Sequence, residues 1–284
     1  MKNKIFVRLV GGYGNQLFIY AFGLAMSKRT GRKLILDNIS GFGSSGDEYN
    51  SLFALSGLSI EDKLISQSRY RYFIANKYFW YLARKLKISH TEMSISRHKE
   101  VDNIKKYFFE GYWQSYLYFD EYKEEIKRNL TLVDSDNLNI KDYKKQILQS
   151  KNSVAIGMRF YEETASAISN HTVKDEDYYT EAITLIETKL SEPKYFIFST
   201  DIPRAREVMS KSSCKDVVYI DPIKAKDNAK LDFYLMSLCQ NFIISNGTFY
   251  WWAAYLGENK KSIVISPKNG FNNLDAIPLN WIKL

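Results

Sequence analysis

The chain has 284 residues, of which 45% are hydrophobic and 25% charged, a composition typical of one large or two ordinary soluble domains. Its 40 Lys and Arg exceed its 32 Asp and Glu, and the net charge of +8 favours anionic partners such as nucleotide phosphates or anionic lipid. The basic residues form no stripe and no nucleic-acid-binding motif, and the two distant cysteines exclude a disulfide framework, so we expect neither nucleic-acid binding nor a cysteine metal site.

The N-terminal apolar run lasts only from Ile5 to Val10, and no other run approaches the length of a membrane-spanning helix. A run of six residues is also too short for a signal peptide, so we expect a cytoplasmic protein. The basic charge leaves open a peripheral contact with the inner face of a membrane. No amphipathic anchor stands out from the sequence.

The most informative stretch follows that first run, which predicts a strand. Gly11-Gly12-Tyr13-Gly14-Asn15-Gln16 leads from the strand into an apolar helix pattern that continues to Met26. Glycines at such a turn let the backbone approach a ligand closely, and the amides of the following helix suit anionic or hydroxylated groups. We therefore predict a ligand site that includes Gly12, Gly14 and Asn15, with Gln16 adding a second amide side chain.

A Rossmann dinucleotide fingerprint is the alternative interpretation of this turn. Leu17 stands where that fingerprint requires its third glycine, so the match is partial. Asp37 ends the next apolar run, near the spacing expected for a ribose-binding acid. A dinucleotide-dependent oxidoreductase therefore stays open at this point, with NAD binding as its test.

The rest of the first half is predicted from composition and spacing. Residues 61–100 are rich in Lys, Arg, Tyr and Leu and predict helices that cover a sheet. Residues 107–114 predict a strand that runs into a loop, and residues 119–130 an amphipathic helix. The polar segment 134–152 is the best candidate for a linker, which divides the chain into domains 1–148 and 149–284.

The second half alternates between strand and helix patterns. Strands are expected at 154–158, 195–198, 217–220, 242–244 and 262–265, and helices at 177–190, 204–211, 231–238 and 249–256. Such alternation predicts a mostly parallel sheet flanked by helices. Two such halves predict a two-domain α/β protein with a cleft between the domains.

Polar residues follow each predicted strand of the second half, where ligands of open α/β sheets bind. Arg159 comes after the first strand and is a candidate to bind phosphate oxygens bidentately, with Glu162 and Glu163 close behind. Thr200 and Asp201 follow the second strand, and Asp201 is a candidate to accept hydrogen bonds from a purine edge or a ribose. Asn246-Gly247-Thr248 opens a helix at Phe249 and offers a second anion site.

Each of these residues also has a purely structural interpretation. Arg159 is expected to pair with Glu162 if it lies at the surface, and Ser, Thr or Asn before a helix is ordinary N-cap chemistry. The pair Trp251-Trp252 is typical of a core. Polar residues at four strand ends in one half of the chain, Asp221 after residues 217–220 being the fourth, favour a nucleotide diphosphate site over these separate explanations.

Several motifs resemble the bacterial α-1,2-fucosyltransferases of glycosyltransferase family 11. The stretch 11–21 resembles the family's GGxGNQLFxYA, and 111–115 resembles GYWQS. Asp177-Tyr178-Tyr179 is similar to a DYY helix start, and 198–201 is similar to the FS-D-D motif. The stretch 235–254 resembles LMSxC followed by IxSNSTFSWWAA. These matches run in order over nearly the whole chain.

The resemblance implies a GT-B-like architecture, with two Rossmann-like domains facing a cleft. It implies an inverting, metal-independent transfer of fucose from GDP-fucose to the 2-hydroxyl of a galactose in a glycan, in polysaccharide biosynthesis. The C-terminal domain would bind the donor and the N-terminal domain the acceptor. Arg159 would meet the donor diphosphate, Thr248 and its neighbours the phosphates or fucose, Asp201 the nucleoside, and Asn15 the sugar side.

One motif departs from the family pattern. Where the family reads HxRRGDY, this chain reads Gly157-Met158-Arg159-Phe160-Tyr161-Glu162-Glu163. The first arginine is kept, whereas the histidine, the second arginine and the Gly-Asp pair are replaced, and Glu162 falls at the aspartate position. A different GDP-sugar donor, a different linkage or acceptor, and a non-catalytic nucleotide-sugar binding protein therefore stay open as alternatives.

In the mechanism that we expect, Arg159 stabilises the leaving diphosphate and a carboxylate helps to deprotonate the acceptor hydroxyl. Glu162 and Glu163 are the nearest candidates for this general base, and Asp37 is a weaker one.

Overall fold

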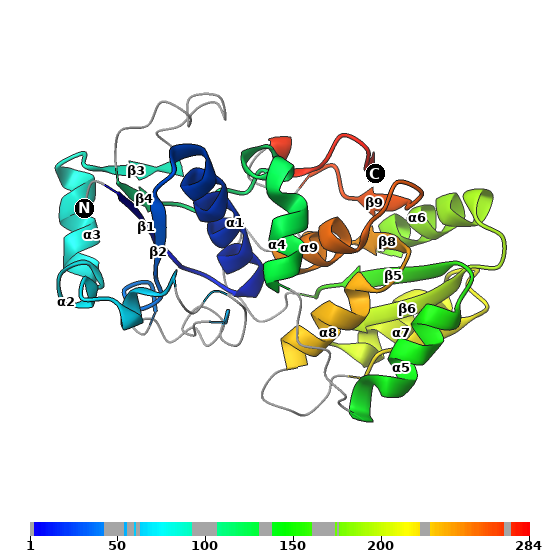
Figure 1. Ribbon diagram of the computed structural model, residues 1–284. Helices are drawn as coiled ribbons and strands as arrows, with labels where there is room; N and C mark the ends of the chain where they lie inside the picture. Colours follow the sequence, from blue (N-terminus) through cyan, green and yellow to red (C-terminus); the bar gives the residue numbers. More distant parts are fainter. Residues whose placement is uncertain are drawn as a thin grey trace. The chain divides into compact units, whose positions relative to one another are not determined.

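The computed structural model describes residues 3–42, 54–55, 60, 63–92, 107–130, 138–160, 174, 176–221, 228–269 and 274–284. The chain forms two compact units (Figure 1). Unit 1 comprises Met1–Leu132 and Asn273–Ala276, and unit 2 comprises Val133–Asn272 and Ile277–Leu284. None of the helices within the described ranges is long and apolar enough to cross a membrane.

Unit 1 is built on a parallel sheet with the strand order β2-β1-β4-β3. Its strands are β1 (Lys4–Arg8), β2 (Lys33–Asp37), β3 (Ser89–Thr91) and β4 (Phe108–Glu110). Its helices are α1 (Tyr13–Thr30), α2 (Arg71–Ile74), α3 (Lys77–Lys85) and α4 (Lys123–Leu130), with short 3₁₀ turns η3 (Ile65–Gln67), η6 (Tyr116–Tyr118), η7 (Asp120–Tyr122) and η9 (Leu274–Ala276).

Side chains that alternate along β1 decide which helix packs on which face of this sheet. Phe6 joins a buried cluster with Ile74 of α2 and Trp80 of α3. On the other face α1 approaches closely, because a Cβ on its Gly23 would lie only 3.3 Å from Val7 Cγ2. Figure 1 shows α1 and α3 on opposite sides of β1 and β2. The helices predicted within 61–100 are therefore confirmed, although that segment also contributes the short strand β3.

Unit 2 is a second parallel sheet, with the strand order β10-β9-β8-β5-β6-β7. Its strands are β5 (Ser153–Met158), β6 (Lys194–Ser199), β7 (Val217–Tyr219), β8 (Asn241–Ile244), β9 (Val264–Ser266) and β10 (Ile282–Lys283). Its helices are α5 (Leu138–Gln149), α6 (Glu176–Lys189), α7 (Ile202–Ser210), α8 (Asn228–Ser237) and α9 (Thr248–Gly257). The alternation predicted from the sequence is confirmed, and β10 is an addition to it.

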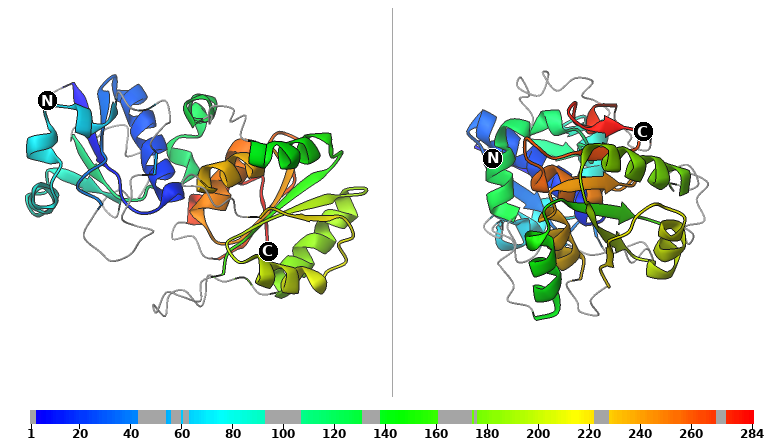
Figure 2. Two further views of the ribbon diagram at one scale, coloured as in Figure 1. Left: turned by 90° about the horizontal axis from the view of Figure 1, so that it is seen from below. Right: turned by 90° about the vertical axis from the view of Figure 1, so that its right-hand side faces the viewer.

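Successive side chains of β5 point to opposite faces of the sheet and therefore contact different helices. Met158 packs in one core with residues of α6 and α7. Gly157 faces the other way, against the ring of Tyr250 in α9. Figure 2 shows α6 and α7 on the side of the sheet opposite α5, which lies against α8. In the strand order, β5 and β8 lie side by side although far apart in sequence, which is where ligands bind in doubly wound sheets.

The segment 134–152 was expected to be a linker, and this expectation is wrong for most of its length. Residues 138–149 form α5, which packs against α8 and so belongs to unit 2. The division of the chain consequently falls after Leu132 rather than after residue 148. The lysines and the aspartate of α5 lie mostly on its solvent-exposed face. Composition alone does not distinguish such a helix face from a linker.

Candidate active site

The glycine-rich loop of unit 1 has the close backbone packing expected of it. Gly11 has a φ of +75°, and a Cβ there would lie 2.8 Å from Asn15 Nδ2 and 3.2 Å from Tyr112 Cε1. Gly12 is the N-cap of α1 and provides no side-chain cap, and Gly14 is buried in the first turn. A side chain at position 11 would therefore displace Asn15, the polar group at the start of this helix.

Asn15 is held by the loop that follows the neighbouring strand β4. Its Oδ1 accepts a hydrogen bond of 3.0 Å from Gln114 Nε2. Glu92, just after β3, accepts hydrogen bonds from the backbone N–H groups of Tyr112 (2.8 Å) and Gln114 (3.2 Å). The carboxyl ends of three adjacent strands thus fix one amide side chain, and the first two family-like motifs meet there.

Trp113 lies between these two backbone contacts in an unusual conformation. Its φ of +55° is rare for a bulky residue and costs about 1–3 kcal/mol. The indole is fully buried and stacks on Phe22 of α1 with ring centroids 3.9 Å apart. This packing holds the strained backbone that presents Gln114 to Asn15, a feature that no local sequence pattern indicated.

Gln16 was expected to open onto the site beside Asn15, and the structure corrects this. Gln16 is fully buried, donates to the carbonyl oxygen of Gly11 (2.7 Å) and accepts from the backbone N–H of Ala54 (2.9 Å). The side chain therefore ties the loop to the body of the unit and has a structural role.

Asp37 is also structural, against the expectation that it could act as a base or bind a ribose. Its carboxylate is fully buried and accepts from the backbone N–H groups of Ile39 and Ser40, both at 3.0 Å. It also accepts from the Ser40 hydroxyl and from Trp80 Nε1, the latter at 2.6 Å. Four donors occupy the oxygens, which leaves Asp37 without the exposure that a general base requires.

In unit 2, the structure brings Arg159 and the Asn246-Gly247-Thr248 turn together. A Cβ built on Gly247 would lie 3.5 Å from one terminal guanidinium nitrogen of Arg159. Arg159 follows β5 and Gly247 follows β8, and these strands are neighbours. Gly247 is the N-cap of α9 and has no side-chain cap, so the first amides of the helix stand beside the guanidinium.

The ring of Tyr250 occupies the space beside Gly157. A Cβ on Gly157 would lie 2.6 Å from both Tyr250 Cγ and Cδ1, and the Tyr250 hydroxyl donates to the Met158 carbonyl oxygen at 3.0 Å. In the family patterns quoted above, position 157 holds a histidine and position 250 a serine. A small residue at 157 and a large one at 250 are thus a complementary pair in this chain.

Asp232 of α8 is a charged residue of this region that the sequence reasoning missed. Burial raises the pKa of its carboxyl to about 6, and its Oδ1 is buried with no hydrogen-bond partner among the described residues. Both Asp232 and Arg159 are close enough to Tyr250 to act on the pKa of its hydroxyl, which burial raises. The available signal was an acid within an otherwise apolar helical stretch.

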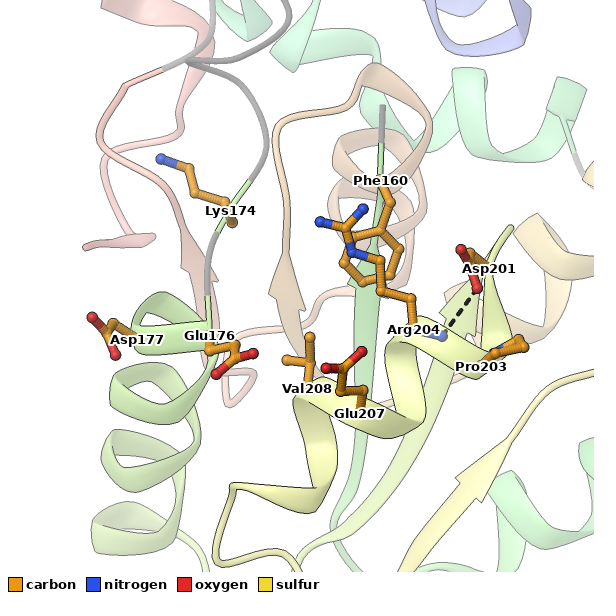
Figure 3. Close-up of a pocket in the computed structure, with 9 residues that line it drawn as sticks. All are labelled: Phe160, Lys174, Glu176, Asp177, Asp201, Pro203, Arg204, Glu207 and Val208. Atoms are coloured by element: carbon orange, nitrogen blue, oxygen red, sulfur yellow. Dashed lines mark hydrogen bonds between the residues drawn. The ribbon is translucent and has the colours of Figure 1, made fainter. Parts of the chain in front are cut away.

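A cavity of about 800 Å³ opens on the α6 and α7 side of the same sheet edge (Figure 3). Its lining is Phe160, Lys174, Glu176, Asp177, Asp201, Pro203, Arg204, Glu207 and Val208. Asp201 is the N-cap of α7 and accepts from the Arg204 backbone N–H at 3.0 Å, so its structural interpretation holds. The same side chain lines the cavity, while Thr200 beside it is exposed.

Arg204 places a cation next to the position where the family pattern has its second arginine. Its guanidinium lies over the ring of Phe160, 4.6 Å from the centroid, and both residues line the cavity. Arg159 and Phe160 project to opposite faces of the sheet, because Phe160 packs on the α6–α7 core whereas Arg159 lies beside Gly247.

The remaining candidates are placed as follows. Asn246 is buried, and Phe249 is half-buried with its ring edge against Phe233. Glu162 and Glu163 lie outside the described residues, so the general base stays a prediction.

The comparisons with known proteins identify the family. A family description, Glycosyl transferase family 11, matches residues 4–283. The chain belongs to glycosyltransferase family 11. The resemblance found in the sequence motifs is thereby confirmed.

Curated relatives of this family 11 chain include two Escherichia coli proteins of similar length. The alpha-1,2-colitosyltransferase is 27% identical, over 99% of this chain and 98% of the relative. The O-antigen biosynthesis glycosyltransferase WbnK is 28% identical, over 97% and 99%. The galactoside alpha-(1,2)-fucosyltransferase 2 of Rattus norvegicus is 27% identical over only 52% of this chain and 43% of its own length.

Solved structures support the fold of the family 11 chain. The NodZ alpha-1,6-fucosyltransferase soaked with GDP-fucose matches with a TM-score of 0.54 at 16% identity, over 90% of this chain and 93% of that one. Arabidopsis thaliana FUT1 in complex with GDP matches with a TM-score of 0.51 at 14% identity, over 96% and 72%. The expected GT-B-like α/β class is confirmed.

Proposed function

We propose that this glycosyltransferase moves L-fucose from GDP-fucose to the 2-hydroxyl of a galactose in a glycan, with inversion to an α-1,2 linkage. The observation that carries the proposal is that the Arg159 guanidinium lies beside the N-terminus of α9, where the N-cap residue is Gly247 and no side chain caps the helix. A guanidinium and helix amides at one point form a site for a diphosphate. Two of the relatives above are named as α-1,2 transferases of a sugar.

The chemistry asked of the protein is electrostatic and geometric. The acceptor hydroxyl attacks C1 of fucose, the C1–O bond to GDP breaks, and the hydroxyl proton passes to a base. Arg159 and the α9 amides would stabilise the negative charge that grows on the departing diphosphate. We propose that these groups suffice without a metal ion, so transfer should be unchanged by EDTA.

Two acids are our candidates for the nucleoside. Asp232 has a buried carboxylate oxygen that could accept a hydrogen bond from a donor on the base. Asp201 lines the cavity and could accept from ribose hydroxyls, since its capping bond uses only one of its lone pairs. Gly12, Gly14 and Asn15 of unit 1 would serve the sugar side, and Glu162 would be the base.

The test replaces Arg159 with alanine and compares it with Arg206→Ala. Arg206 is exposed in the same unit, with its guanidinium 3.9 Å from the Tyr219 ring centroid, so it controls for the loss of one arginine. Arg159→Ala should lower kcat by about 10²–10³-fold, as removal of one charge-stabilising donor does elsewhere. Arg206→Ala should retain activity. A folded Arg159→Ala protein with near-wild-type turnover would refute the assignment.

A second donor is favoured by one specific observation, the full-length similarity to an alpha-1,2-colitosyltransferase. Colitose differs from fucose by lacking the 3-hydroxyl group. Competition between GDP-fucose and GDP-colitose on one galactoside would decide, because a site that hydrogen-bonds the 3-hydroxyl discriminates against the deoxy sugar. A preference for GDP-colitose would replace the fucose assignment and keep the diphosphate site.

Thermal-shift measurements with GDP, UDP, ADP and NAD separate the remaining classes. Stabilisation by GDP alone supports a GDP-sugar site, because a ligand stabilises only the state that binds it. Stabilisation by NAD would favour the oxidoreductase alternative. GDP binding without GDP release from donor and acceptor would indicate a binding protein.

A further inference from the structure

The outer surface of α2 and α3 in unit 1 combines exposed aromatic and basic side chains. Tyr72 and Phe73 of α2 are 75% and 74% exposed, and Tyr78 of α3 is 74% exposed. Phe is among the residue types most often buried and Tyr is intermediate, so three such rings exposed within seven residues form an unusual surface. We call it the α2–α3 face. Its members are Arg71, Tyr72, Phe73, Lys77, Tyr78, Tyr81, Leu82, Lys85 and Leu86.

The helix period explains how α3 exposes these groups. Trp80 and Ala83 are buried on its inner side, where Trp80 joins the core of the sheet. Tyr78, Leu82 and Lys85 occur at the i, i+4 and i+7 positions and therefore share the outer side. Helix α3 packs on unit 1 through its buried residues, Trp80 and Ala83. Packing within unit 1 therefore does not explain why the aromatic rings on the outer side are there.

The formally charged side chains of the stretch that contains the α2–α3 face are all positive. Residues 63–91 contain seven Lys and Arg and no Asp or Glu. Arg84 forms an ion pair with Glu110 Oε2 at 3.3 Å. Arg71 lies over the Tyr72 ring at 5.1 Å and Lys77 over the Tyr78 ring at 5.6 Å, so cations and aromatic rings are interleaved on the face.

We propose that the α2–α3 face docks unit 1 on an anionic membrane surface. Lys and Arg would contact lipid phosphates, and the Tyr and Phe rings would enter the interfacial layer, where aromatic side chains are favoured. This inference goes beyond the transfer reaction and does not depend on the donor. It identifies the amphipathic anchor that the sequence did not single out.

Charge complementarity selects the membrane over a second copy of the chain. In a two-fold dimer the same patch meets itself, so the positive charges of two α2–α3 faces would be brought together. An anionic lipid surface satisfies the charges and the apolar rings at once.

The experiment is co-sedimentation of the full chain with vesicles of phosphatidylcholine alone and of phosphatidylcholine with 30% phosphatidylglycerol. One variant is Lys77→Glu/Lys85→Glu, and a second is Phe73→Ser/Tyr78→Ser/Tyr81→Ser. The matched control is Lys260→Glu/Lys261→Glu, which makes the same charge change at two exposed lysines of unit 2. Thermal unfolding and turnover with a water-soluble acceptor verify that each protein is folded and active.

Wild-type and control proteins should sediment with the anionic vesicles and remain in solution with the neutral ones. The lysine variant should bind at least roughly 30-fold more weakly, the expectation for two lost charges near an anionic surface. The aromatic variant should also lose binding while turnover in solution is kept. The proposal is overturned if wild-type protein ignores anionic vesicles, or if both variants bind like the control.

Light scattering measures the oligomeric state and so tests whether a second copy of the chain covers the α2–α3 face. A wild-type dimer that the aromatic variant converts to a monomer would assign the face to a second copy and overturn the proposal. Because turnover is measured in solution, failure of the fucosyltransferase assignment would show there for every protein, independently of vesicle binding.

Discussion

Replacement of Gly157 by alanine should destabilise unit 2 and weaken donor binding together. The new Cβ would lie 2.6 Å from two ring atoms of Tyr250, a separation that real Cβ contacts do not show. The ring has little room to retreat, because it is buried and its hydroxyl is bonded to the Met158 carbonyl oxygen. The opposite edge of the ring faces Gly247, where a Cβ would be 3.4 Å from Tyr250 Cδ2. A displaced ring would therefore disturb the Asn246-Gly247-Thr248 turn, where we propose that the diphosphate binds.

The magnitude follows from overpacking. Inserting a methyl into a close-packed site costs about 1–3 kcal/mol, and the loss of unfolded-chain entropy on Gly→Ala offsets about 0.4–1 kcal/mol of that. A net cost of about 1–2 kcal/mol corresponds to a fall in Tm of about 3–8 °C for a unit of this size. Gly157→His, which restores the family residue, should cost more than Gly157→Ala because the imidazole needs the same space.

The complementary pair gives the decisive experiment, the double variant Gly157→His/Tyr250→Ser. Tyr250→Ser alone should cost about 3–5 kcal/mol, as loss of a buried aromatic ring does. If the two side chains share one space, the double variant should be at least about 2 kcal/mol more stable than the sum of the single costs. Denaturant unfolding of all four proteins measures this coupling. Additive costs, or a Gly157→Ala protein as stable as wild type, would refute the reasoning.

Three further predictions concern other buried or stacked groups. Asp37→Asn should destabilise unit 1 by about 3 kcal/mol in urea unfolding, because it disturbs a fully bonded carboxylate, yet leave the KM for donor unchanged in the folded protein. Arg204→Ala should raise the KM for donor with little change in kcat, since it removes the cation over Phe160 but not Arg159. Burial raises the pKa of Asp232 to about 6, so the carboxyl favours the folded state when protonated and this stability is lost as pH rises through 6. Asp232→Asn should therefore be more stable than wild type at pH 8, with the difference disappearing toward pH 4, and should bind GDP more weakly at pH 8.

The parallel sheets and the proximity of Arg159 to the Asn246-Gly247-Thr248 turn were predictable because local patterns encode them. Strand and helix periods in residues 154–265 fix the alternation, and parallel connections then place the residues after β5 and β8 at one edge. That reasoning brought Arg159 and Gly247 together before any contact was known. It needed no side-chain geometry.

The sequence did not predict which side chains of the glycine-rich turn point into the site and which point into the body of unit 1. Asn15 and Gln16 are adjacent amides, and only the three-dimensional packing shows that Asn15 meets Gln114 whereas Gln16 bonds back to Gly11. Asp37 ends strand β2, and Asp232 lies in the middle of helix α8. One has four donors and the other a buried oxygen without a partner in the described part of the chain, a difference set by residues distant in sequence.

The departures from the family pattern around β5 are best understood as one rearrangement rather than separate losses. Position 157 is a glycine where the family pattern has a histidine, and the ring of Tyr250 of α9 occupies the space beside it. Position 160 is a phenylalanine where the family pattern has an arginine, and the Arg204 guanidinium lies over the ring of this phenylalanine. In both cases an aromatic ring or a cation returns to the same edge of the sheet from a different helix. Arg159 keeps its place beside Gly247, because β5 remains paired with β8 as far as Gly157 and Ile244, even with glycine at position 157.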